Sequence, residues 1–292
     1  MEWGGRGLDI QNGYLRFRGL RVHYRVSRPE DDPITRRVLL LNAPLSSMFN
    51  WRLMIPELLS QGCLVAQVDL PGYGLSACGS GVPQDAETRA QLVWGILDEI
   101  DAASGHASQF WHLIAHGSAC LTALTMAHDV PEAVASEVLI APILRSPVRP
   151  FYRRFPGNRM LDGAFNRWYC DRILSRKGMR ELLRQWFGRS VPDYVLDHMR
   201  RPLVRPGMKP QLRRLIDEGF GVDPAIFAGF TPTMALWGQR DPLLSANDAA
   251  QIRASLTGAE IHVLHTAAHF PQETHSRAVG DYLRGWLKYI DG

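Results

Sequence analysis

Short apolar runs recur along this chain, and they constrain its fold more than any other feature. Each run is apolar at nearly every position, which is typical of a strand buried on both faces of a parallel sheet. Helical patterns over residues 91–100 and 121–128 lie between them. Strands that alternate with helices predict an α/β fold with a mostly parallel, doubly wound sheet. The runs cover residues 38–41, 64–68, 111–115, 138–141, 233–237 and 261–264.

The chain before the first of these runs follows a different pattern. Residues 14–18 and 20–26 alternate apolar and polar side chains on either side of Gly19. A period of two is typical of a strand with one buried face, and a glycine between two such strands favours a tight turn. We therefore expect an antiparallel hairpin ahead of the parallel strands.

Residues 145–220 differ from the rest of the chain in charge and in pattern. They contain 18 Lys and Arg against 7 Asp and Glu, whereas the remainder has 15 against 22. Apolar residues recur at helical spacing in 179–187 and 194–199, and few runs look like strands. We expect a basic helical segment over 145–220, inserted between the two parts of an acidic core, 1–144 and 221–292.

Several motifs stand at the ends of the apolar runs, within residues 38–44, 65–76, 110–127, 233–244 and 261–273. Together they resemble the α/β-hydrolase superfamily. Residues 110–127 look like that family's strand, sharp turn and helix, and four more segments follow in the family's order. The resemblance is to capped members such as epoxide hydrolases, haloalkane dehalogenases and esterases. It covers nearly the whole chain and implies an α/β-hydrolase fold, with 145–220 as the helical cap. The four segments are 38–44 with Trp51, 65–76 (VAQVDLPGYGLS), 233–244 (TMALWGQRDPLL) and 261–273 (IHVLHTAAHFPQE).

The turn within 110–127 departs from the family at its most important position. The family's turn reads small-x-nucleophile-x-small, and Ala115 and Ala119 supply the small residues. The resemblance then places Gly117, which has no side chain, at the nucleophile position. A shift of one residue would make Ser118 the nucleophile, but a histidine and a cysteine would then crowd the turn. In the first frame Ser118 is a residue at the start of a helix.

The oxyanion hole that the resemblance implies is also incomplete. The family uses the backbone N–H of the residue after the nucleophile, here Ser118, and that of the residue after a His-Gly pair. Asn42 and Ala43 stand in place of the pair, so the second donor falls on Pro44, which has no N–H. If the loop is displaced by one residue, Asn42, Ser46 or Ser47 would supply a substitute donor.

Two further catalytic positions of the family are present. The resemblance assigns Asp241 as the triad acid and His269 as the triad histidine, 28 residues apart. A carboxylate that orients an imidazole makes a general base near neutral pH. An inherited but unused pair is the alternative. Trp51, His116 and Phe270 are candidate pocket residues, with core packing as the alternative for each.

These features support three classes of function. The first is a small-molecule enzyme that uses Asp241 and His269 as a general-base pair without a covalent intermediate, as a lyase, cyclase or cofactor-free oxygenase does. The second is an ester or thioester hydrolase, in which Ser118 attacks or the pair activates water. The third is a catalytically inactive protein that binds a ligand or regulates a partner.

Composition and motifs bound the partners and the location. No apolar run reaches the ~18 residues of a membrane span, and the N-terminus lacks a secretory pattern. The four cysteines lack metal-ligand spacing, so we expect a cytoplasmic protein without a metal or cofactor. The basic segment suits an anionic substrate, an acyl carrier protein or a coenzyme A ester, or is simply a solvated face. No nucleic-acid motif accompanies the charge, and the oligomeric state is left open.

Overall fold

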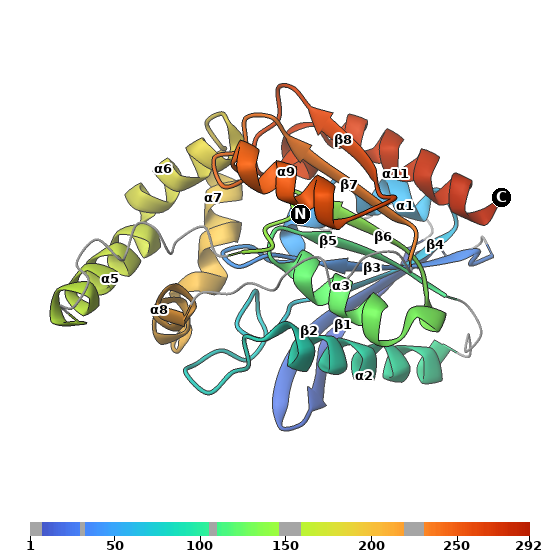
Figure 1. Ribbon diagram of the computed structural model, residues 1–292. Coiled ribbons are helices and arrows are strands. Elements are labelled where there is room, and N and C mark those ends of the chain that lie inside the picture. The colour runs from blue at the N-terminus through green and yellow to red at the C-terminus, as the bar shows by residue number, and fades with distance from the viewer. Residues whose placement is uncertain (1–7, 30–32, 105–109, 146–158, 219–230) are drawn as a thin grey trace.

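The computed structural model describes residues 8–29, 33–104, 110–145, 159–218 and 231–292. Its strands form one eight-stranded sheet in the order β1-β2-β4-β3-β5-β6-β7-β8 (Figure 1). The first two pairings are antiparallel and the other five are parallel. The strands are β1 (Leu8–Phe17), β2 (Leu20–Pro29), β3 (Arg36–Leu41), β4 (Cys63–Val68), β5 (Trp111–His116), β6 (Val134–Ile140), β7 (Thr233–Gly238) and β8 (Glu260–Leu264).

All six predicted parallel strands and the N-terminal hairpin are confirmed. The side chains of β4 and β5 are buried throughout, because helices cover both faces of the sheet. The turn between β1 and β2 uses Arg18 and Gly19, both with positive φ. Strand β6 begins at Val134, before the predicted run. The apolar run begins later because Ser136 and Glu137 are polar, although both side chains are buried in the strand.

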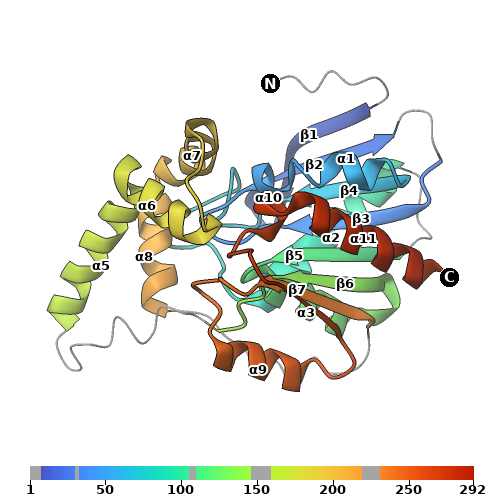
Figure 2. The ribbon, with the colours of Figure 1, turned by 90° about the horizontal axis from the view of Figure 1, so that it is seen from above.

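Helices cover the two faces of the sheet and continue beyond one of its edges. Figure 1 shows α2 and α3 on one face of the sheet, and α1 and α11 on the other, which faces the viewer in Figure 2. Helices α5 to α8 follow β6 and lie to one side of the sheet (Figure 1). The helices are α1 (Ile55–Leu59), α2 (Ala86–Ser104), α3 (Ala119–Asp129), α5 (Arg159–Leu174), α6 (Arg176–Phe187), α7 (Asp193–Arg200), α8 (Met208–Glu218), α9 (Ala246–Ser255), α10 (Pro271–Thr274) and α11 (Ser276–Asp291), with short 3₁₀ helices η1 (Met48–Trp51), η2 (Pro131–Ala133) and η3 (Arg201–Val204).

Two hydrophobic clusters hold the chain together. The larger one surrounds the sheet and includes Trp51, which is fully buried. The second consists of side chains from α5 to α8 and from the segments between them, and it also includes Phe270, which follows β8. Helices α5 to α8 therefore pack against the loop that leaves the sheet after β8. The proposed boundaries of this helical unit, 145 and 220, remain a prediction.

The register of the parallel strands decides which loops meet. Leu41 at the end of β3 pairs with Val68 of β4 and with Ala115 of β5. His116 pairs with Ile140 of β6. The segments that follow β3, β4 and β5 therefore leave the sheet at the same edge, where ligands of open α/β sheets usually bind.

Candidate active site

Gly117 forms the sharp turn between β5 and α3. Its φ is +60°, its N–H donates to the carbonyl of Ile140 at 2.9 Å, and its carbonyl accepts from the N–H of Ile143 at 3.1 Å. An ideal Cβ built on Gly117 would lie 3.6 Å from His269 Nε2. The Cβ direction at position 117 therefore faces the imidazole of His269.

His269 and Asp241 form a buried hydrogen-bonded pair. His269 Nδ1 lies 2.8 Å from Asp241 Oδ2, and the two side chains are 3% and 0% exposed. The other carboxylate oxygen accepts the N–H of Leu243 at 2.8 Å. Because a carboxylate only accepts, Nδ1 carries the proton of this hydrogen bond, and in a neutral imidazole Nε2 then bears the lone pair. The structure thus brings the two residues together as a potential general base.

His116 is a second histidine beside this pair. Its Nε2 donates to the backbone carbonyl of His269 at 2.8 Å, and the two rings are 4.7 Å apart. Burial, and secondarily the neighbouring His269, lowers the pKa of His116 well below its ordinary value. His116 is therefore neutral near pH 7 and holds the loop of His269 by one hydrogen bond. Its Nδ1 is buried without a hydrogen-bond partner.

Ser118 lies at the N-cap of α3 but does not cap the helix through its side chain. Its Oγ is buried and makes no hydrogen bond, so it is not bonded to His269 in this structure. The backbone N–H groups at the start of a helix lack partners within the helix. The N–H of Ser118 therefore has no partner within the helix.

The loop after β3 carries the three candidates for a substitute donor, Asn42, Ser46 and Ser47, and they differ in their hydrogen bonds. Ser46 Oγ donates to the carbonyl of Ala43 at 2.8 Å, and Ser47 Oγ accepts the N–H of Phe49 at 3.4 Å. Asn42 is 1% exposed, and neither atom of its amide has a hydrogen-bond partner. Pro44 has no N–H to give. Of the three, Asn42 is thus the residue whose side chain makes no hydrogen bond at all.

Of the three candidate pocket residues, His116 and Phe270 lie side by side. Phe270 lies beside His116 at 4.7 Å between ring centroids, and it stacks on Phe187 of α6 at 4.9 Å. Trp51 packs in the core around the sheet. The aromatic surroundings of His269 consequently come from His116, Phe270 and the helical unit.

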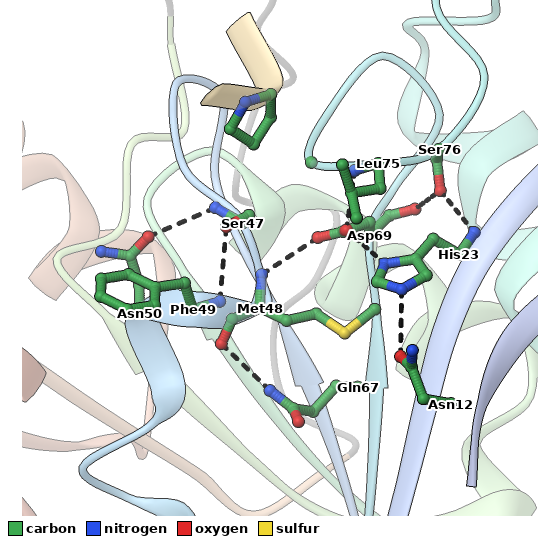
Figure 3. Close-up of polar contacts among 12 residues, drawn as sticks. Asn12, His23, Ser47, Met48, Phe49, Asn50, Gln67, Asp69, Leu75 and Ser76 are labelled. Atoms are coloured by element: carbon green, nitrogen blue, oxygen red, sulfur yellow. Dashed lines mark hydrogen bonds and ion pairs between the residues drawn. The ribbon is translucent and has the colours of Figure 1, made fainter. Parts of the chain in front are cut away.

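Asp69 is the centre of a hydrogen-bond network that the sequence motif did not reveal. Figure 3 shows its carboxylate between His23 of β2, Met48 and Leu75. Oδ2 lies 2.8 Å from His23 Nδ1 and accepts the Leu75 N–H at 2.9 Å, while Oδ1 accepts the Met48 N–H at 3.0 Å. A Cβ at Gly74 would lie 2.0 Å from Asp69 Cγ, so glycine is required there. This second His–Asp pair fixes loops, and none of the contacts named here involves Gly117.

Trp186 makes a contact with the candidate base that no sequence pattern signals. The N–H of His269 donates to the carbonyl of Trp186 at 2.8 Å. The residues lie on different segments, separated by β7 and β8, and a backbone contact leaves no trace in side-chain spacing. Helix α6 is therefore attached to the loop that carries His269.

Much of the positive charge of the helical unit is used within the protein. Arg176 contacts Asp197, Arg180 contacts Asp193, and Arg184 lies 2.8 Å from Glu181. Arg205 donates to the carbonyls of Gly74, Leu75 and Ser76 at 2.6 to 3.0 Å. These arginines stabilise the unit and its attachment to the sheet, while Arg153 and Arg154 lie outside the described residues.

The described part of the chain contains neither a metal-binding cluster nor a membrane-spanning helix. Within the described residues, no group of three His, Cys, Asp or Glu side chains is arranged to hold a metal ion. None of the helices in the same ranges is long and apolar enough to span a bilayer.

The chain is similar to known proteins over most of its length. The model of a family described as "Alpha/beta hydrolase family" matches residues 38–281. An "Uncharacterized hydrolase YugF" of Bacillus subtilis is 23% identical over 278 residues, which cover 92% of this chain and 95% of that protein. A 2-hydroxy-6-oxononadienedioate/2-hydroxy-6-oxononatrienedioate hydrolase of Cupriavidus pinatubonensis is 21% identical over 239 residues, 78% of each chain.

Solved structures resemble this one in fold. The haloalkane dehalogenase DatA of Agrobacterium tumefaciens has a TM-score of 0.74 at 20% identity, with 98% of each chain covered. The 2-hydroxy-6-oxo-6-phenylhexa-2,4-dienoate hydrolase of a Rhodococcus species has a TM-score of 0.74 at 17% identity, with 96% of this chain and 99% of that chain covered. At these identities the likeness establishes the fold and leaves the chemistry to the site.

Proposed function

The chain belongs to the alpha/beta hydrolase family, and on that premise we propose that it is a small-molecule enzyme in which His269 acts as a general base without a covalent intermediate. One observation carries the proposal: an ideal Cβ on Gly117 would lie 3.6 Å from His269 Nε2. The base therefore faces a position that has no side chain to deprotonate. A group of the substrate that lies between this turn and the imidazole gives its proton to Nε2.

The two paired residues take up and return the proton that is transferred in this reaction. His269 Nε2 accepts a proton from an acidic C–H or O–H of the substrate, and Asp241 stabilises the resulting imidazolium through Nδ1–H. The imidazolium then returns the proton to another atom of the product or to solvent. General-base catalysis of this kind typically contributes ~10²–10⁴ in rate.

Two donors support the negative charge that proton removal leaves on a substrate oxygen. The N–H of Ser118 at the start of α3 is one, favoured by the helix dipole. The amide of Asn42, buried and without a partner, is the second and replaces the donor that Pro44 lacks. The proposal thus favours substrates with an acidic proton next to a carbonyl group.

Hydrogen exchange in D₂O tests the proposal before the product is known. Ketones, β-keto acids and acyl thioesters are incubated with the protein, and loss of the acidic C–H signal is followed by NMR. We expect exchange that His269→Ala abolishes and that His265→Ala, a change at an exposed histidine bonded to Gln239, leaves intact. Exchange that persists in His269→Ala would remove His269 as the base.

A second candidate is hydrolysis by a water molecule that His269 activates. It is favoured because both curated relatives described above carry the name hydrolase. The basic helical unit would then suit an ester or thioester of an acyl carrier protein or coenzyme A. Turnover of p-nitrophenyl esters that depends on His269, with no adduct in intact-mass spectra after a fluorophosphonate, would select this reaction.

The same spectra decide whether Ser118 acts as a nucleophile. We expect no adduct, because Ser118 Oγ makes no hydrogen bond to His269. A stable adduct mapped to Ser118, and lost in Ser118→Ala, would make the protein a serine hydrolase. Binding of a ligand without exchange or turnover would instead favour an inactive member of the family.

A further inference from the structure

The C-terminus of α6 is built to approach the loop that carries His269. The last carbonyls of a helix have no partner within the helix, and that of Trp186 accepts the His269 N–H at 2.8 Å. The helix ends at Phe187, and the next residue, Gly188, turns the chain away with a φ of +66°. An ideal Cβ on Gly188 would lie 3.3 Å from the Cβ of Ala268, so glycine also allows the close approach.

The side chain of Trp186 reaches the same imidazole as its carbonyl. The indole lies edge-on to the His269 ring, with centroids 5.7 Å apart and planes at 67°. It also lies 6.1 Å from the ring of Phe270, which stacks on Phe187. Together with these rings, the indole covers an imidazole whose side chain is only 3% exposed.

The helical unit has a second attachment that does not involve His269. Arg205 donates to the carbonyls of Gly74, Leu75 and Ser76 after β4. Gln211 Oε1 accepts the N–H of Gly79 at 3.3 Å. Because these contacts hold η3 and α8 to the sheet, a change at the end of α6 need not detach the whole unit.

We propose that Trp186 is a positioning residue for His269. Its carbonyl fixes the backbone of the loop that carries the base, and its indole keeps water away from the imidazole. The Asp241–His269 hydrogen bond thereby stays in a dry environment, where it orients the base more strongly than in water. The inference rests on the proposed role of His269 as the base, but its test does not require a substrate.

The test follows His269 itself by three measurements on the whole protein. Proton NMR detects the Nδ1–H that Asp241 holds, and amide exchange reports the N–H that Trp186 accepts. Carbethoxylation by diethylpyrocarbonate, mapped by mass spectrometry at fixed pH, reports access to the imidazole. The variants are Trp186→Ala, Trp186→Phe and Gly188→Ala.

Two controls separate positioning from general destabilisation. Trp168→Ala removes an aromatic side chain of α5 that is 56% exposed. Leu183→Ala removes a fully buried side chain of α6 that packs in the cluster of α5 to α8. Neither residue has a ring contact or hydrogen bond with His269. Leu183→Ala weakens α6, the helix that carries Trp186, and therefore controls for loss of stability.

We expect Trp186→Ala to raise the carbethoxylation rate of His269 at least about tenfold, since local opening limits access to a buried group. The Nδ1–H signal should broaden and the His269 amide should lose protection. Gly188→Ala should change the amide in the same way, and Trp186→Phe should restore most of the shielding. Both controls should match the unaltered protein.

Equal behaviour of His269 in Trp186→Ala, Gly188→Ala and the unaltered protein would overturn the proposal. Changes of the same size in Leu183→Ala would also overturn it, because Trp186 would then act only through the stability of α6. If Trp186→Ala does not fold, Gly188→Ala and Trp186→Phe carry the test. Failure of the D₂O exchange experiment leaves these measurements unaffected, so the two proposals fail separately.

Discussion

The methyl group of Ala43 stands against the α-carbon of Gly117. An ideal Cβ on Gly117 would lie 2.8 Å from the Cβ of Ala43, closer than two such atoms approach in proteins. Ala43 follows β3 and Gly117 follows β5, two neighbouring parallel strands. The loop beside the turn is therefore adapted to a residue without a side chain at position 117.

Restoring a side chain at position 117 should destabilise the protein. We expect Gly117→Ser to lower the free energy of unfolding by about 2–4 kcal/mol, because the positive φ is strained and Ala43 is in contact. Ala43→Gly should relieve part of this cost, so that the double variant is more stable than the sum of the single effects by at least about 1 kcal/mol. Urea denaturation of the four proteins measures this coupling. Additive effects would show that Ala43 does not oppose the side chain.

Asp241→Asn should separate catalysis from folding. The amide keeps the size of the carboxylate but no longer favours the tautomer with the proton on Nδ1 of His269. We expect His269-dependent exchange or turnover to fall by about 10²–10⁴, the range of general-base catalysis. Asp248→Asn, a change in the exposed cap of α9, is the matched control. An active Asp241→Asn enzyme would show that the pair is not used.

Glu137 should make stability depend on pH. Burial raises the pKa of this carboxyl from 4.5 to about 7, while a hydrogen bond to Thr233 opposes the rise. Because the folded pKa lies above the unfolded one, its contribution is fully present below pH 4.5 and is lost as pH rises through 7. A pKa shift of this size corresponds to a loss of about 3 kcal/mol in the free energy of unfolding at high pH.

Glu137→Gln checks the pH dependence. The amide cannot ionise, so the variant should gain stability relative to the unaltered protein as pH rises from 5 to 8. Thr233 Oγ1 lies within hydrogen-bond distance of both the Thr231 carbonyl and Glu137 Oε2, and its single proton serves only one of them. A protonated Glu137 satisfies both contacts. Denaturation curves with the same pH dependence for both proteins would contradict the raised pKa.

Asp69→Asn should loosen the loops that Figure 3 shows around the carboxylate. Its two oxygens accept from Met48 and Leu75 and contact His23, whereas an amide has one oxygen. At least one buried donor would lose its acceptor, at a cost of about 2–3 kcal/mol. Asp98→Asn on the exposed face of α2 should stay within about 0.5 kcal/mol. Chemical denaturation of both variants distinguishes a structural network from a surface charge.

The strands were predictable because burial on both faces leaves an unmistakable apolar run. The pattern failed at the start of β6, where Ser136 bonds to His112 and Trp286, so that polar side chains are satisfied inside the core. Helix α11 is not among the predicted helices, although Val279, Leu283 and Leu287 are fully buried and recur at helical spacing. Its amphipathic pattern is visible in the sequence.

The site was predictable only where the strand order determines it. Asp241 and His269 follow the neighbouring strands β7 and β8, and the structure brings them together, while their catalytic role stays a prediction. The contact of His269 with Trp186 joins a helix terminus to a loop, and no periodic pattern encodes it. Likewise, the unpaired amide of Asn42 depends on neighbours that the sequence does not identify.

The acceptors of Arg205 determine how the helical unit responds to its surroundings. A guanidinium bound to three backbone carbonyls has no partner that gains a proton in acid. Arg176 and Arg180 instead contact exposed carboxylates, which acid neutralises and salt screens. Acid or high salt should therefore weaken the ion pairs between α6 and α7 while the contacts of Arg205 with the sheet persist. In an acidic or saline environment the unit would lose these surface contacts before it lost its attachment.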